Sequence, residues 1–253
     1  MADIQLNSVT LATESGGVVT VDSAAAGTGG LRSQQVFTTV GAVTWTRPSG
    51  ITTIEIYCTG GGAGGGGGNA NWNNGGGGGA GATAIGIVDV ISIPTLALVV
   101  GNFGAAGAAG AAGSSGTDST VTISGGAQIC NGGFGERGSA PWSADPKPGT
   151  VGKGGTATVT TGSNFLLLAG GDGGAGGGGD ILDESSSGAI GGSSYWGGGG
   201  QQGASTSVID AAHYGGKAAR CYGAGGGGGD DDNGTSFAGG AGMSGIILIK
   251  EYS

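Results

Sequence analysis

The residues that most often carry out chemistry are sparse in this sequence, and none has the spacing of a metal site. The acidic run "DDDN" at 230–233 offers oxygen atoms that suit a hard cation, but its members are consecutive rather than spaced as in a calcium loop. His213 is the single histidine and has no cysteine or histidine partner at metal-binding spacing. We therefore expect no metal centre, and we expect a solvated acidic turn at 230–233.

Nucleophilic catalysis and sugar hydrolysis find no better support. Asp210 lies close to His213 and serines are abundant, but no nucleophile-elbow motif is present. The carboxylates are scattered rather than paired as in a glycosidase, and the glycine runs lack the Lys-Ser/Thr that follows a phosphate-binding loop. We predict that the protein is not an enzyme and takes no cofactor. A polysaccharide depolymerase stays open as an alternative.

Three cysteines, an odd number, imply no disulfide framework. Cys58 and Cys130 fall in apolar, strand-like segments, so we expect them to be small buried hydrophobic residues. Cys221 falls in an expected loop, where its thiol could be exposed.

Aromatic side chains within polar inserts are the best candidates for recognition, because they bring a large contact area at a low entropic cost. The alternative is that some of them cover the ends of a glycine-rich bundle as a small local core. Trp45 differs, since it lies in a strand-like segment and is expected to pack in the core. The candidates for receptor binding are Trp72, Trp142, Tyr195, Trp196, Tyr214 and Tyr222.

Charge and hydropathy exclude several classes of partner. The formal net charge of −9 argues against nucleic acid, whose phosphates require a basic face, and against an anionic membrane surface. No apolar run is long enough to span a bilayer. The N-terminus "MADIQLNSVT" lacks the pattern of a secretory signal, so we expect synthesis in a cytoplasm and release by another route, such as lysis.

The elements that must position any site are expected to be strands. In "TTIEIYC" (52–58), apolar and polar residues alternate with the period of a half-buried strand. The last strand, 244–252, has apolar residues on both faces and is expected to be central. We predict a mainly β protein with a β-sandwich-like core and almost no α-helix. The other expected strands are 5–13, 18–22, 82–92, 95–100, 119–123, 127–130, 156–160 and 164–169.

Glycine provides 68 of the 253 residues, mainly in runs at 60–68, 75–81, 170–179, 197–200 and 223–229. A polyglycine chain can form an extended threefold helix of the polyproline II type, whose N–H and C=O groups all point outward. Such helices can hydrogen-bond side by side, and their axes can approach closely only where no Cβ intervenes. We therefore predict a packed bundle of glycine helices; mobile glycine loops are the alternative.

The chain divides into an N-terminal segment, 1–33, and a glycine-rich β domain, 36–253. The first segment reads as two short strands followed by a linker, and two strands alone bury too little to be stable. We expect it to pair with the main domain, another copy or a larger assembly. Long polar inserts separate the glycine runs in the second part, at 69–74, 134–149, 180–196, 201–222 and 230–237.

The segment "VFTTVGAVTWTRPSGITTIEIYCTGGGAGGGGG" resembles the start of a glycine-rich domain of bacteriophage tail-fibre and tail-tip receptor-binding proteins. The likeness extends over about 36–253, through "GGGGAGA", Pro94 and the closing "GAGMSGIILIKEY". A looser likeness is to the polyglycine-helix adhesins of T-even-type phages. The residues that carry the opening match are Phe37, Thr38, Thr44, Trp45, Thr46, Pro48, Gly50, Ile51, Ile54 and Ile56.

This resemblance implies a virion structural protein for host attachment, assembled in the host cytoplasm. Its loops would bind a host surface receptor, either a glycan or an outer-membrane protein, and it would bind no nucleic acid. Residues 1–33 would join other tail or baseplate proteins, and the family implies a homotrimer. The alternatives are the depolymerase, an ice-binding polyglycine bundle with a flat face of repeated Thr or Ala, and a non-viral surface or matrix protein.

Overall fold

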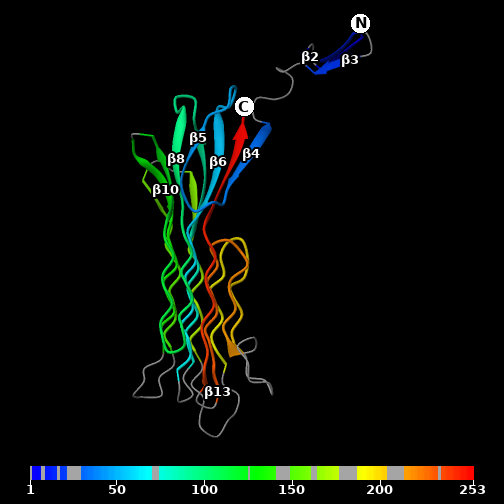
Figure 1. Cartoon of the computed structure of the whole chain (residues 1–253). Helices are drawn as coiled ribbons and strands as arrows, with labels where there is room; N and C mark the ends of the chain where they lie inside the picture. Colours follow the sequence, from blue (N-terminus) through cyan, green and yellow to red (C-terminus); the bar gives the residue numbers. More distant parts are fainter. Residues whose placement is uncertain are drawn as a thin grey trace.

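The computed structural model of the chain consists of two packed antiparallel sheets and a bundle of extended glycine-rich segments below them (Figure 1). No α-helix forms among the strands and extended segments, so the expected mainly β class is confirmed for the part of the chain that the structure describes. The described residues are 2–6, 9–15, 18–21, 30–69, 74–124, 126–140, 149–160, 164–176, 187–203, 214–232 and 235–253.

Each sheet of the sandwich has five antiparallel strands. The first, in spatial order, is made of β12 (Phe165–Leu168), β7 (Thr83–Asp89), β6 (Thr53–Thr59), β15 (Ile246–Tyr252) and β4 (Leu31–Phe37). The second is made of β11 (Thr158–Val159), β10 (Gln128–Gly132), β9 (Ser119–Ile123), β8 (Thr95–Val100) and β5 (Gly41–Thr46). Strand β15 is paired on both sides, as its apolar pattern predicts.

The N-terminal residues form a separate three-stranded sheet of β1 (Ala2–Leu6), β2 (Val9–Ser15) and β3 (Val18–Val21). The single strand expected at 5–13 is therefore wrong, because the chain forms two strands there, which pair antiparallel. Strand β4 runs through the expected boundary between the two parts, and it pairs with β15 from Leu31 onward.

The core of the sandwich is built by the alternation seen in the sequence. Ile54, Ile56 and Cys58 of β6 are buried against the opposite sheet, while Glu55 and Tyr57 face outward. Trp45 is fully buried, as expected, and its indole N–H donates a 2.7 Å hydrogen bond to Glu251. A buried carboxylate requires such donors, because the loss of water would otherwise cost several kcal/mol.

Cys58 and Cys130 are both buried free thiols, which confirms the expectation for these two residues. They belong to opposite sheets, β6 and β10, and the hydrogen bond with Cys58, together with burial, raises the pKa of Cys130. Since the reactive form is the thiolate, the Cys130 thiol is held in its inert form. Cys221 is a free thiol that is partly exposed.

The described glycine segments of the bundle are packed helices, and segment 60–68 shows the arrangement most clearly. Three neighbouring segments accept hydrogen bonds from its N–H groups. Successive N–H groups donate to each of the three in turn, so that every third bond goes to the same segment. The first segment accepts from Gly60, Ala63 and Gly66. The residues one position later donate to the second segment, and those two positions later donate to the third. The acceptors are Ala82, Gly79 and Gly76, then Thr117, Ser114 and Ala111, then Met243, Gly240 and Phe237.

The carbonyl groups of 60–68 use three further segments, around 104–110, 135–138 and 226–229, whose N–H groups donate to them. This helix therefore has six neighbours. The segments 74–82 and 223–230 are hydrogen-bonded on all sides in the same way. Threefold helices with outward-pointing backbone groups predict this arrangement, and the expected packed bundle is confirmed.

The outer helices of the bundle differ from the glycine runs in sequence, because they have a glycine only at every third position. Glycine recurs at every third position in 101–116, and Gly104, Gly107 and Gly113 are buried while the residues between them are exposed. A methyl group on Gly104 would clash with the backbone carbonyl of Ser114. The G-x-x repeat thus marks a helix at the edge of the bundle, with glycine facing inward.

Candidate functional site

Parts of the long polar inserts are anchored at the end of the bundle opposite the sandwich, where β13 lies in Figure 1. The bounds expected for three inserts are too wide, because 134–140, 187–196 and 214–222 are hydrogen-bonded along the bundle. The described residues that flank 70–73, 141–148, 177–186, 204–213 and 233–234 are tied to one another there by backbone hydrogen bonds. These bonds run from Gly68 to Phe237, from Gly149 to Asn74, from Gly176 to Gly149, from Gly188 to Gly203 and from Asp230 to Tyr214.

A small local core closes this end. Tyr214 is 1% exposed and stacks on Phe237, with ring centroids 5.0 Å apart and an interplanar angle of 18°. Asn74 is fully buried and donates to the Ser187 carbonyl at 3.1 Å. Tyr214 was a candidate for receptor binding, but its ring is not exposed to a partner. It instead covers the end of the bundle as part of a local core, which was the alternative interpretation.

The acidic run is partly inside the bundle, so the expectation of a solvated turn is wrong for its first two residues. Asp230 and Asp231 are fully buried. The reason is that Asp230 ends a central helix, while Asp231–Asp232 forms β13 and pairs with β14, Thr235–Ser236. Oδ1 of Asp230 accepts a 2.8 Å bond from the Asp231 N–H. Among the described residues, no group of three potential metal ligands comes together.

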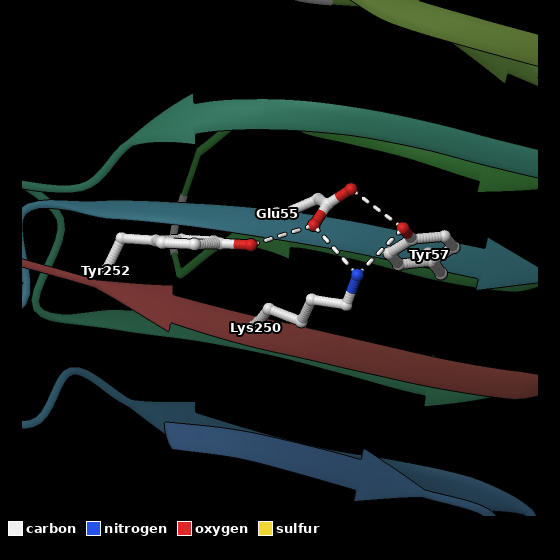
Figure 2. Close-up of polar contacts among 4 residues, drawn as sticks. All are labelled: Glu55, Tyr57, Lys250 and Tyr252. Carbon is white, nitrogen blue, oxygen red and sulfur yellow. Dashed lines mark hydrogen bonds and ion pairs between the residues drawn. The ribbon is translucent and has the colours of Figure 1, made fainter. Parts of the chain in front are cut away.

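A second cluster lies on the outer face of the first sheet, and Figure 2 shows its polar part. We call this the aromatic–polar face; its residues are Glu55, Tyr57, Tyr195, Trp196, Lys250 and Tyr252. Strands β6 and β15 are in register with Glu55 opposite Lys250, which brings the two charged groups within 3.1 Å. The Tyr57 hydroxyl donates to Glu55 Oε1 at 2.7 Å, and the Tyr252 hydroxyl donates to Oε2 at 3.0 Å.

The electrostatics of this network favour the ionised pair. Burial alone raises the pKa of Glu55, but hydrogen bonds from Tyr57, Lys250 and Tyr252 and the Lys250 charge outweigh it, so the pKa lies below its ordinary value. Hydrogen bonds with Tyr57 and Glu55 raise the pKa of Lys250. The Lys250 ammonium also lies 4.7 Å from the centroid of the Tyr57 ring, a cation–π contact.

Two predicted residues, Tyr195 and Trp196, belong to this face. They are the central residues of a tight turn closed by the bridge between Ser194 and Gly197. The Trp196 indole N–H donates to Thr59 Oγ1 at 2.8 Å, which fixes the turn to the sheet. Tyr195 packs edge-on against Trp196 at 5.1 Å and lies 6.0 Å from the Tyr57 ring, yet its side chain remains 49% exposed.

A shallow depression of about 350 Å³ continues the aromatic–polar face across β6, β7 and β12. Glu55 forms its polar wall, while Ile87 and Leu166 are 59% and 58% exposed along its apolar side. The outer face of the sheet thus combines exposed apolar area with a fixed carboxylate and ammonium.

The other predicted residues have different positions. Tyr222 is half-buried, and its carbonyl accepts a 2.6 Å bond from Ser194 Oγ, beside the turn of Tyr195. Trp72 and Trp142 lie outside the described residues. Sequence reasoning did not single out Glu55, Tyr57, Lys250 or Tyr252. The alternation of apolar and polar residues in each of the two strands indicated that these side chains face outward. That they form one cluster follows only from the pairing of β6 with β15.

The fold is that of an all-β protein with a polyglycine bundle, and the comparison with protein families agrees. The chain belongs to the family described as "Glycine-rich domain", whose model matches residues 38–252. No curated protein matches the sequence significantly. In the described part of the chain, no helix has the length and apolar character to cross a membrane.

Proposed function

We propose that the protein is a structural protein of a bacteriophage tail fibre or tail tip, and that it binds a receptor on the host cell surface. The observation that supports this most directly is that the residues flanking five polar stretches are tied together at one end of a hydrogen-bonded frame. The five stretches are 70–73, 141–148, 177–186, 204–213 and 233–234. Loops presented by a rigid scaffold are where recognition concentrates. The resemblance of 36–253 to phage receptor-binding domains gives the proposal its biological setting.

In this proposal, attachment requires binding and no chemical step. Each contact can be weak, because several fibres on one virion raise the effective concentration of the next binding event. Residues 1–33 would join other tail or baseplate proteins, and three copies would form the fibre. Trp72 and Trp142 are the candidate contacts of these inserts with a glycan or an outer-membrane protein. Tyr195, Trp196 and Tyr222, which the sequence also predicts as contacts, lie beside the first sheet instead. The protein would reside in the virion.

The test is adsorption of the purified protein to candidate host cells after the inserts have been shortened. The structure limits the deletions to 141–148 and 204–213, because 133–140, 149–157 and 214–220 are bundle segments whose backbone bonds must remain. We expect the two deletions together to reduce bound protein at least about tenfold, equivalent to about 1.4 kcal/mol of binding free energy.

A matched control is Ile91→Ser, a substitution of an exposed side chain in a sandwich turn remote from the inserts. This variant should bind like the wild type. Amide exchange of the 60–68 segment shows in each variant whether the bundle is intact. Unchanged adsorption of an intact double deletion contradicts the proposal for these inserts.

A second candidate, ice binding, is favoured by one specific observation. The outer helices at 101–110 and 111–117 lie antiparallel, and between Gly104 and Gly113 their G-x-x repeats expose pairs of alanine side chains. The exposed alanines are Ala105, Ala106, Ala108, Ala109, Ala111 and Ala112. Thermal hysteresis of the purified protein distinguishes the two candidates, since an attachment protein should show none.

A further inference from the structure

We infer that the aromatic–polar face is a binding site for a neutral saccharide, with a pyranose ring lying between Tyr195 and the Glu55–Lys250 pair. This inference does not depend on the proposed function, because the face lies on the sandwich rather than at the end of the bundle that carries the inserts. Three features of the face support it: its exposed ring, its unfilled hydrogen-bonding positions and its balance of charge.

The exposed ring is that of Tyr195. Saccharides present a weakly polar C–H face beside their hydroxyl groups, and an aromatic side chain offers such a face a large, rigid contact. Tyr195 is fixed for this role, because its neighbour Trp196 is bonded to Thr59 and packs perpendicular to it at 5.1 Å. A side chain that is already ordered loses little conformational entropy when a ligand binds.

The polar pair has hydrogen-bonding capacity left over. An ionised carboxylate has about four acceptor positions and an ammonium has three donors. Tyr57, Lys250 and Tyr252 fill three of the positions on Glu55, and Tyr57 and Glu55 use two of the donors on Lys250. One acceptor position on Glu55 and one donor on Lys250 therefore remain, on two groups that are 3.1 Å apart. A sugar hydroxyl matches them, since it can donate to the carboxylate while it accepts from the ammonium.

The charge of the site favours a neutral ligand. Glu55 and Lys250 are of opposite sign and 3.1 Å apart, so the pair carries no net charge. The side chains are 20% and 28% exposed, which leaves both groups open to solvent and to a ligand. An acidic sugar would gain no net attraction here, and the protein as a whole, at −9, would repel it. The adjoining depression, about 350 Å³, shares Glu55 with this site.

The test is titration of the full-length protein by saturation-transfer NMR and calorimetry. The probes are the methyl glycosides of glucose, galactose, mannose and N-acetylglucosamine, with glucuronate and sialic acid as the acidic arm. We expect at least one neutral glycoside to bind. Tyr195→Ala and Lys250→Met should each weaken it about tenfold or more, whereas Tyr195→Phe should retain binding within about twofold.

The control is Phe103→Ala, which removes an aromatic ring that is 44% exposed on an outer helix of the bundle. It should leave saccharide binding unchanged. Sedimentation of the wild type and of Tyr195→Ala accompanies the titrations. Absence of binding by every neutral probe overturns the inference, as does binding of the acidic probes alone. A loss of oligomeric state in Tyr195→Ala also overturns it, because the face would then be a subunit interface.

Discussion

At the scale of single residues, Glu55 links two neighbouring strands of the first sheet, β6 and β15. It accepts hydrogen bonds from Tyr57 on its own strand and from Tyr252 on β15, and it pairs with Lys250 (Figure 2). Its lowered pKa means that the folded protein binds a proton at this position less readily than the unfolded chain does. The network therefore links stability to pH.

We predict that Glu55→Gln lowers the free energy of unfolding near pH 7 by up to about 1 kcal/mol, the scale of a partly exposed charge network. Because the folded pKa is depressed, this contribution is present above the ordinary carboxyl pKa and is lost as the pH falls through the folded value. Urea unfolding of the wild type and the variant between pH 7 and pH 3 measures the difference. It should shrink toward zero at the acidic end.

The matched control is Glu136→Gln, at an exposed carboxylate on an outer bundle segment. Its difference from the wild type should stay small at every pH. A difference for Glu55→Gln that persists unchanged at pH 3 contradicts the assignment of the stabilisation to the ionised carboxylate.

The residues whose environment follows from local pattern were predictable, and those that depend on distant pairing were not. The burial of Trp45, Cys58 and Cys130 follows from alternation within one strand. The contact of Lys250 with Tyr57 joins residues 193 positions apart and depends on the register of two strands. Asp230 was expected to be exposed to solvent but is buried. The acidic residues around it in the sequence do not show that a central helix of the bundle extends to this position.

At the scale of elements, the bundle replaces side-chain packing by contact between backbones. A methyl group added to Gly64 would fall against the backbone of Ala105 at far less than van der Waals distance. The Gly64 N–H also donates to Ser114 at 2.9 Å, so the segments cannot separate without losing that bond. A close approach of this kind is available only to glycine.

We predict that Gly64→Ala lowers the free energy of unfolding by about 3 kcal/mol, the upper range for overpacking a close-packed interior. The comparison is Ala106→Ser, on an exposed position of the adjoining outer helix. That substitution should change stability by no more than about 0.5 kcal/mol. Thermal and urea unfolding of both variants measure the effects. Equal stabilities would mean that the close approach at Gly64 is absent in solution.

The existence of the glycine helices could be predicted from the runs, but their neighbours could not. The chemical reason for glycine, the absence of a Cβ, is visible in any run. The sequence does not show which segment accepts the hydrogen bond of Gly62 or Gly65, because every glycine segment presents the same backbone groups. The period of three in 101–116, in contrast, was a readable sign of which helices lie at the edge.

At the scale of the whole molecule, the sandwich and the bundle form one continuous frame. Strand β6 passes from Thr59 directly into the central helix 60–68, and Gly245 precedes β15 at the end of another bundle segment. The sandwich is stabilised by the packing of apolar side chains, and the bundle is stabilised by backbone hydrogen bonds. The inserts are anchored where these bonds end.

We predict that backbone amides of 60–68, 170–176 and 223–229 exchange as slowly as those of β6 and β15. Each of these segments donates to neighbouring segments, so exchange requires their separation. Hydrogen–deuterium exchange with mass spectrometry of the full chain measures this. Rapid exchange in the glycine segments, with slow exchange in the strands, would remove the rigid frame on which the attachment proposal depends.

The threefold rotation of donors also governs how the length of this molecule can change. Insertion of one or two residues in a glycine segment would turn every later N–H toward the wrong neighbour. Insertion of three, matched in the adjoining segments, restores each donor to its own acceptor. The distance between the sandwich and the anchored inserts can therefore grow or shrink only in steps of one triplet, about 9 Å.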